Sequence, residues 1–209
     1  GIIMDEEPDF FDDIEYIRKI SNPGAKRQAV LEFAMNSGIF HDVGKINFIS
    51  LFTRTARQWF AAEYEITQLH TVVGSARLKA CASTRLFAAA ALGHHSWYDG
   101  SRGYPESYKR LECPERQMVD VIGLIDWMDN SMNRAWLYGH AKKNFDETVQ
   151  EALTLEGKRF SPLLTARLRD NAAVETLRQA FETTRYEAYR QLYLQTGAHG
   201  KSPQDIIKL

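Results

Sequence analysis

The stretch His41-Asp42-Val43-Gly44-Lys45 follows residues 26–36, where apolar side chains recur at helical spacing. Residues 84–95 repeat this arrangement, because a second apolar, alanine-rich helix is predicted to end at His94-His95. Helix formers dominate the rest of the chain, and no alternating strand pattern of useful length and no internal repeat occurs. We therefore predict an all-α fold in which two helices deliver histidines at their C-terminal ends.

Gly and Pro divide the remaining sequence into further predicted elements. A segment rich in Gly, Pro, Ser and Tyr, residues 98–110, is predicted to be a loop. Further helices are expected at residues 12–21, 56–69, 70–80, 114–138, 145–155 and 172–194.

Composition limits the classes of partner. The 209 residues carry a net charge of −1, so bulk electrostatics does not favour a DNA or RNA polymer or an anionic membrane. The two cysteines, Cys81 and Cys113, lack C-x-x-C spacing, which favours free thiols in a reducing cytoplasm. No apolar run approaches the roughly 20 residues of a membrane span. Since the first residue is Gly, we expect an upstream sensory domain in a longer protein.

Potential metal ligands are concentrated in one region. Of the six histidines, His41, His70, His94 and His95 all lie before Asp99. An imidazole beside a carboxylate, as in His41-Asp42, is a ligand mixture suited to Fe, Mn or Zn, and a carboxylate can bridge two ions. Any one histidine could instead be a core residue bonded to a backbone carbonyl, but the clustering favours a metal site.

A further carboxylate is predicted on the helix at residues 114–138. Asp126 shares a helix face with Val119 and Ile122, so its side chain should be partly buried. A buried carboxylate needs a cation or hydrogen-bond donors, which makes Asp126 a candidate ligand. His140 and His199 lie outside these motifs and are excluded.

The motifs together resemble a known family. His41-Asp42-Val43-Gly44-Lys45 reads His-Asp-x-Gly-Lys, His70 begins His-x-x-x-Gly, residues 94–105 resemble His-His-x-x-x-Asp-Gly-x-Gly-Tyr-Pro, and Asp126 begins Asp-x-x-Asp. In this order they are similar to the HD-GYP branch of the HD-domain phosphohydrolases, over roughly residues 34–138.

The resemblance implies a helical HD-domain bundle with extra C-terminal helices and hydrolysis of cyclic di-GMP. It implies an N-terminal helix at residues 1–22, a catalytic core at 23–140 and a C-terminal extension at 141–209 packed on that core. A cyclic dinucleotide would be the substrate. A diguanylate cyclase or an upstream sensory domain would be a partner, and the chain could form an oligomer.

The resemblance also implies two divalent ions, Fe or Mn first, with Zn, Mg or Ni as alternatives. Asp42 would bridge them, His70, His94 and His95 would complete one shell, and His41 and Asp126 would belong to the other. Ions sharing a carboxylate lower the pKa of a water for in-line attack on a phosphodiester.

Lys45 and the loop complete the predicted site. Lys45 is placed to stabilise phosphoryl charge or protonate the departing oxygen, although a solvated surface lysine is the alternative. In the loop, Tyr104 could stack on guanine and Arg102 could contact phosphate beside Gly103. Arg134 falls where the family has a substrate-binding arginine, and a helix-surface arginine is the alternative.

The sequence departs from the family pattern at two places. No histidine precedes His41, where the family has a further ligand; Asp9, Asp12, Asp13 or Glu15 could replace it, the histidine could lie upstream, or the first metal could be weak or lost. Ser96 replaces a usual Glu, and the Asp-Gly-x-Gly spacing is one residue longer. Three functions stay open: a cyclic di-GMP phosphodiesterase, a phosphohydrolase of another nucleotide or phosphoester, and a catalytically weak regulatory module.

Overall fold

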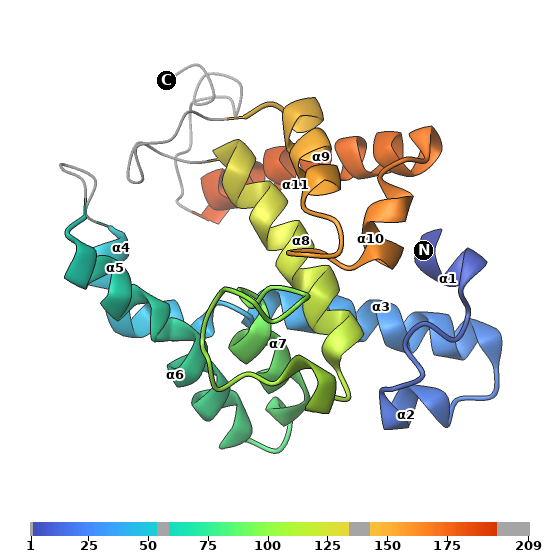
Figure 1. Cartoon of the computed structure of the whole chain (residues 1–209), viewed down its shortest axis with the longest axis horizontal. Helices are drawn as coiled ribbons and strands as arrows, with labels where there is room; N and C mark the ends of the chain where they lie inside the picture. The colour runs from blue at the N-terminus through green and yellow to red at the C-terminus, as the bar shows by residue number, and fades with distance from the viewer. Residues whose placement is uncertain (1, 54–58, 134–142, 196–209) are drawn as a thin grey trace. The chain divides into compact units, whose positions relative to one another are not determined.

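The computed structural model describes residues 2–53, 59–133 and 143–195, and within these residues every regular element is a helix (Figure 1). Between Glu156 and Phe160 there is only an isolated bridge, and the described residues contain no strand. The predicted all-α class is confirmed. In the same residues, no helix combines the length and the apolar character needed to cross a membrane.

The chain divides into two compact units, residues 1–167 and 168–209. The α-helices of the first unit are α1 (Ile2–Glu6), α2 (Glu15–Arg18), α3 (Pro23–Phe40), α4 (Ile49–Phe52), α5 (Ala61–Gln68), α6 (His70–Lys79), α7 (Ala88–Gly93), α8 (Arg116–Asn133), α9 (Phe145–Thr154) and α10 (Pro162–Arg167). Three 3-10 helices accompany them, η1 (Val43–Phe48), η2 (Arg85–Phe87) and η3 (Arg110–Glu112).

Helix α3 begins at a strong capping sequence. The Asn22 side chain accepts a hydrogen bond from the Ala25 amide (2.9 Å), and Pro23 occupies the first turn, where its missing N–H costs nothing. The prediction began this helix at Lys26, because Asn-Pro-Gly also ends the preceding helix. The helix continues through Phe40 to its C-cap at His41, four residues beyond the predicted end at residue 36.

The main core joins α2, α3, α7 and α8. Its buried side chains include Ile17 on α2, Phe33 on α3, Ala90 on α7 and Met118 on α8. Complete burial of a large apolar side chain contributes about 1.5–3 kcal/mol. Figure 1 shows α8 running past α3 and α7, and the small alanines of α7 permit this close packing. These contacts hold the middle of α3 and of α7 against the first turns of α8.

A glycine fixes the approach of η1 to α6. A Cβ at Gly44 would lie only 1.9 Å from the His70 carbonyl oxygen and 2.7 Å from the Gly74 amide nitrogen. Only a residue without a side chain therefore fits, and the segment after Asp42 lies directly against the start of α6. The third and fourth residues of the His-Asp-x-Gly motif thus have a packing role.

The N-terminal helix implied at residues 1–22 is instead two short helices, α1 and α2, separated by turns at residues 7–14. The short helices α4 and α10 were not predicted, because each spans less than two turns and carries no readable apolar period. The first unit extends to Arg167 and so includes α9 and α10, whereas the sequence-based core ended at residue 140. The second unit contains α11 (Asn171–Gln195), close to the helix predicted at residues 172–194. Asp170 begins it by accepting from the Ala172 amide (2.8 Å).

Candidate metal centre

Three histidines have one ring nitrogen fixed by the backbone of their own helical turn. Nδ1 lies 2.7 Å from the Gly38 carbonyl oxygen in His41, 2.6 Å from that of Thr67 in His70, and 2.9 Å from that of Ala90 in His94. A carbonyl oxygen only accepts, so Nδ1 must carry the proton in each ring. When such a ring is neutral, Nε2 has its lone pair, the form in which imidazole binds metal.

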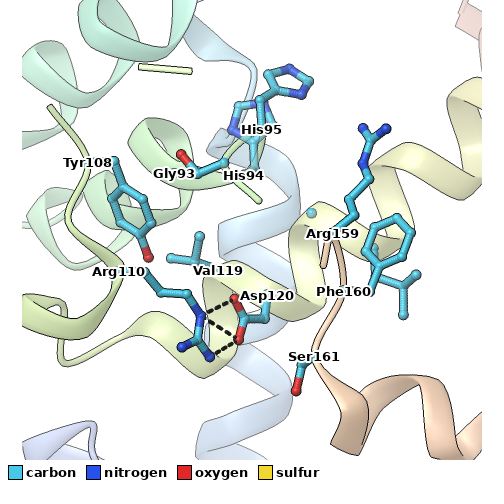
Figure 2. A pocket seen from close by; sticks show the side chains of 13 residues that line it. Gly93, His94, His95, Tyr108, Arg110, Val119, Asp120, Arg159, Phe160 and Ser161 are labelled. Atoms are coloured by element: carbon cyan, nitrogen blue, oxygen red, sulfur yellow. Dashed lines mark hydrogen bonds and ion pairs between the residues drawn. The ribbon is translucent and has the colours of Figure 1, made fainter. Parts of the chain in front are cut away.

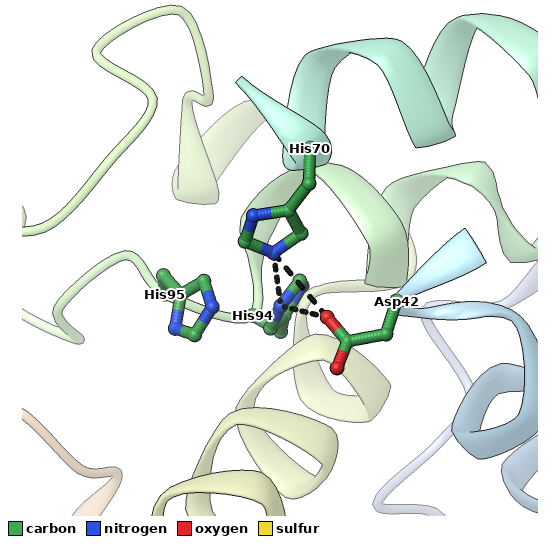
Figure 3. Close-up of side chains that lie close together, drawn as sticks. All are labelled: Asp42, His70, His94 and His95. Carbon is green, nitrogen blue, oxygen red and sulfur yellow. Dashed lines mark hydrogen bonds and ion pairs between the residues drawn. The ribbon is translucent and has the colours of Figure 1, made fainter. Parts of the chain in front are cut away.

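The free Nε2 atoms converge on Asp42. Oδ1 of Asp42 lies 3.3 Å from Nε2 of His70 and 3.6 Å from Nε2 of His94 (Figure 3). Its other oxygen, Oδ2, lies 3.3 Å from Nε2 of His41. The carboxylate therefore presents one oxygen to each of two histidine groups, which is the arrangement of a bridging ligand.

Asp126 closes the second group from α8. Its Oδ1 lies 3.4 Å from Nε2 of His41, and its Oδ2 lies 3.9 Å from Nδ1 of His95. Asn130, one turn later, donates to Asp126 Oδ1 (2.8 Å) and holds that carboxylate in place. The side chain of Asp126 is 10% exposed, in agreement with the partial burial predicted from its helix face.

Among the described residues, two sets of side chains could each hold a metal ion, and they share Asp42. The first set is Asp42, His70, His94 and His95, and the second is His41, Asp42 and Asp126. In each set the ligand atoms lie within 4.8 Å of one another. The family resemblance implied the same two groups for these six residues, and the fold brings all of them together.

The donor atoms are arranged for a cation. Nε2 of His70 and Nε2 of His94 lie 3.4 Å apart, although both carry lone pairs and cannot bond to each other. Two atoms about 2.1 Å from one ion are separated by roughly 3.0 Å at right angles and 3.4 Å at the tetrahedral angle. His41 Nε2 and Asp42 Oδ1 are buried without a hydrogen-bond partner. A metal ion would satisfy all these atoms, so the residues present fit the group.

Electrostatics within the cluster favours ionised carboxylates and neutral inner histidines. Burial alone would raise the pKa of Asp42, but the His41, His70 and His94 contacts outweigh it and hold that pKa far below its usual range. Burial lowers the pKa of His94, and burial with positive neighbours lowers the pKa of His95 further. Neutral imidazoles beside a carboxylate are the protonation states that a metal ion requires.

His41 behaves differently because it faces two carboxylates. Burial lowers its pKa, but contacts with Asp126 and Asp42 outweigh this and raise the pKa to about 10. The protein groups alone therefore bind a proton where a metal ion would compete for the same Nε2. This half of the centre is held by one histidine and two carboxylates, fewer nitrogens than the other half.

Lys45, the last residue of the His-Asp-x-Gly-Lys motif, contacts the Asp42 carboxylate. Its ammonium donates to Asp42 Oδ2 and lies 5.4 Å from the centre of the Phe52 ring. The side chain is 30% exposed, so Lys45 is not the fully solvated surface lysine of the alternative interpretation. The ammonium is held where the metal centre meets the open cavity.

The metal centre opens into a cavity of about 660 Å³, within the range of about 300–1,000 Å³ typical of small-molecule sites. Seven predicted site residues line it: Lys45, His70, His95, Asp126, Arg102, Gly103 and Tyr104. The fold thus places the predicted substrate loop and the predicted ligands around one space.

The loop reaches the centre through Gly103 and Tyr104. Gly103 has φ of +93°, and a Cβ there would lie 2.2 Å from the His95 carbonyl oxygen, so glycine is required for this approach. The Tyr104 ring lies 4.6 Å from the His95 ring and partly covers it. Arg102 is exposed, with its guanidinium 5.3 Å from the Trp97 ring.

A partly buried ion pair fixes the far end of this loop to α8. Arg110 donates to both carboxylate oxygens of Asp120, with distances of 3.0 Å from Nε and 2.5 Å from Nη2 (Figure 2). Its guanidinium also lies 4.0 Å from the Tyr98 ring. Because α8 also carries Asp126, the same helix anchors the loop and supplies a ligand of the second group.

Several lining residues were missed by sequence reasoning. Trp97, Trp127 and Arg159 contribute to the wall beside the loop, and Asn130 and Phe52 lie closer to the ligands. Trp127 and Asn130 follow Asp126 on α8, so their place on the predicted helix could have indicated that they lie near the site. Arg159 comes from a turn after α9, and no motif marks it.

The predicted substrate-binding residue Arg134 lies outside the described residues, as do His140 and His199, which were excluded from the predicted site. The carboxylates considered as substitutes for the missing upstream histidine take part in other contacts: Asp9 and Asp12 pair with Lys26, Asp13 with Arg116, and Glu15 with Lys19. None of them belongs to a candidate ligand set in the part of the chain that the structure describes.

Comparison with known proteins adds no relative: no family model matches the chain, and no curated protein matches it significantly.

Proposed function

We propose that the chain is a metal-dependent phosphodiesterase of the HD-GYP type, which opens cyclic di-GMP to linear pGpG and continues to GMP. The observation that carries this proposal is the shared carboxylate. Asp42 presents one oxygen to each of two ligand groups, next to Lys45 and a cavity that accommodates a small molecule. Two divalent ions, Fe or Mn first and Zn, Mg or Ni as alternatives, would be held by these two groups.

When bound, such ions supply Lewis acidity and a water ionised near neutral pH. The residues of the chain supply orientation and charge. His70 and His94 keep their metal-binding nitrogens fixed through the carbonyls of Thr67 and Ala90. Asn130 orients Asp126 by donating to it.

Lys45 has the position for charge stabilisation. Its ammonium lies at the mouth of the metal centre and lines the cavity, so it can donate to a phosphoryl oxygen or protonate the departing alkoxide. The contact with Asp42 holds the ammonium within reach of a phosphate bound at the centre. Preorganised charge of this kind acts on the transition state more than on the bound substrate.

The loop supports the choice of a guanine-bearing diester. Tyr104 partly covers His95 and lines the cavity, where its ring can stack on a base. Two departures favour alternatives: the longer Asp99–Gly103 spacing favours a different nucleotide or phosphoester, and the nitrogen-poor second ligand group favours a weakly active regulatory module.

A substrate comparison tests the proposal. Protein stripped with chelator and reloaded with Mn²⁺ or Fe²⁺ should hydrolyse cyclic di-GMP to pGpG faster than it hydrolyses 4-nitrophenyl phosphate, with products separated by chromatography. Turnover of another nucleotide, with none of cyclic di-GMP under any metal, would support the second function. Binding of cyclic di-GMP without turnover of any phosphoester would support the regulatory module.

A further inference from the structure

The cavity next to the metal centre has a further wall, which helices α4 and α5 provide. Four residues of this wall line the cavity: Phe52, Tyr64, Thr67 and Gln68. Gln68 is the last residue of α5, and the candidate ligand His70 begins α6 two residues later (Figure 1). This wall is therefore joined directly to the metal centre.

Hydrogen bonds fix the backbone at Gln68. Its carbonyl accepts a hydrogen bond from the hydroxyl of Thr71 (3.0 Å), a fully buried residue. The carbonyl of the preceding residue, Thr67, lies 2.6 Å from Nδ1 of His70 and holds that ring. The same turn therefore orients a metal ligand and sets the point from which the Gln68 side chain extends.

The Gln68 side chain offers both a donor and an acceptor to the cavity. A side-chain amide accepts through its oxygen and donates through its NH2 group. Gln68 is half-buried, and its amide makes no hydrogen bond to another described residue. Asn130, the other side-chain amide among the described lining residues, is already bonded to Asp126. The Gln68 amide is therefore available to a bound molecule.

Two aromatic rings from different segments lie near the first ligand set. The Phe52 ring lies 6.3 Å from the His70 ring, and the Tyr104 ring lies 6.2 Å from it. Phe52 also lies 5.4 Å from the ammonium of Lys45. A base attached to a phosphate bound at Lys45 can therefore stack on Phe52 while another base stacks on Tyr104.

A cyclic dinucleotide brings two bases into the cavity, and Tyr104 can stack on only one of them. The second base needs another ring and polar groups for its edge. Guanine presents the N1–H donor beside the O6 acceptor, which matches the oxygen and the NH2 group of a glutamine amide. A phosphate offers only acceptors and would use only half of that amide. The chemistry of Gln68 therefore suits a base.

We propose that Phe52 and Gln68 form a second base site, in which Gln68 pairs with the edge of a guanine that stacks on Phe52. This assignment rests on the proposed phosphodiesterase function. It makes Gln68 a residue that distinguishes between bases and gives it no part in the metal centre.

The test uses competition on the Mn²⁺-loaded full chain. Hydrolysis of bis(4-nitrophenyl) phosphate is followed with cyclic di-GMP or cyclic di-AMP as competitor, which gives the inhibition constant Ki of each dinucleotide whether or not it is cleaved. For Gln68→Leu, Ki for cyclic di-GMP relative to KM for the small diester should rise about 2- to 10-fold, the scale of one lost neutral hydrogen bond.

Gln68→Glu should change the preference between bases. A glutamate accepts from both N1–H and the N2 amino group of guanine, but it has no donor for N1 of adenine. Ki for cyclic di-AMP divided by Ki for cyclic di-GMP should therefore rise about 10- to 100-fold, the scale of a two-point base contact. Gln150→Glu is the matched control, because Gln150 is an exposed glutamine on α9 that does not line the cavity. It should retain the wild-type ratio.

An unchanged relative Ki in Gln68→Leu would overturn the base site. Equal changes for both dinucleotides in Gln68→Glu would also overturn it, because a contact with sugar or phosphate does not depend on the base. Either result would leave the proposed function intact in a wild-type chain that cleaves cyclic di-GMP. A wild-type chain that cleaves the small diester and is inhibited by neither dinucleotide would overturn both. If Gln68→Leu does not fold, the ratio for Gln68→Glu decides.

Discussion

The metal cluster and the wall of the substrate cavity are built in opposite ways. The ligands lie at helix ends and helix starts, except Asp126, which lies within α8. The rings of His41, His70 and His94 are fixed by carbonyls three or four residues earlier. The wall instead joins the loop at residues 98–110 to α8 and to a turn after α9. Local hydrogen bonds can orient a metal ligand accurately, whereas substrate recognition depends on contacts between segments that are distant in the sequence. Changes in the cluster should therefore affect all substrates, and changes in the wall should affect their ranking.

The largest effect is expected for Asp42→Ala. Removing the shared carboxylate takes a ligand from both groups, so kcat should fall at least about 1,000-fold, beyond the about 10- to 100-fold typical of losing an outer-shell partner. Bound metal should fall in parallel, as measured by elemental analysis. Asp9→Ala, at a position that is 84% exposed and outside both groups, is the control. Unchanged metal content and activity in Asp42→Ala would contradict the bridging role.

Lys45→Ala should retain metal and lower kcat by about 100-fold, the scale of losing one preorganised donor to the transition state. The reason is that Lys45 contacts Asp42 and the cavity but belongs to neither ligand set. Steady-state kinetics with both cyclic di-GMP and bis(4-nitrophenyl) phosphate should show the loss. A variant that loses only substrate affinity, with kcat preserved, would exclude this role.

Gly44→Ala should destabilise the fold by about 1–3 kcal/mol, the usual cost of overpacking. Its Cβ would meet the His70 carbonyl at 1.9 Å, so metal affinity should fall as well. Urea unfolding with and without Mn²⁺ would measure both effects. Gly38→Ala provides the contrast, because its Cβ meets nothing within 4 Å inside α3 and alanine favours a helix by about 1 kcal/mol. Equal stability changes in the two variants would show that the η1 contact does not constrain His70.

Tyr104→Ala should have the smallest effect of these four variants, and it should change the ranking of substrates. Loss of one base stack costs about 1–3 kcal/mol, so kcat/KM for cyclic di-GMP should fall by that amount relative to the small diester. Competition between the two substrates in one reaction measures the ratio directly. Equal losses on both would mean that Tyr104, which lies 4.6 Å from the His95 ring, shapes the metal centre instead.

The sequence predicted the helices that carry a full apolar period and the residues that follow a motif. His94 was predicted at a helix end and is a C-cap, whereas His41 was predicted to follow a helix that ended at residue 36 and is the C-cap of a helix that continues to Phe40. Asp126 was found from its helix face. These features depend on local spacing, which a sequence displays directly.

Other features depend on tertiary contacts and could not be predicted. Arg159 reaches the cavity through backbone hydrogen bonds to Tyr98 and Asp99, and an arginine in a Gly-Lys-Arg turn has no distinguishing pattern. The ion pairs of Asp12 with Lys26 and of Asp13 with Arg116 could not be predicted from the sequence either. These carboxylates were therefore considered as substitute ligands. Pairing across long sequence distances decides their roles.

Metal content tests the central claim most directly. Protein purified without chelator in metal-replete medium should contain two equivalents of Fe or Mn per chain by elemental analysis, because the two ligand groups share Asp42. Less than one equivalent of any transition metal would contradict a metal centre at these residues and the phosphodiesterase built on it.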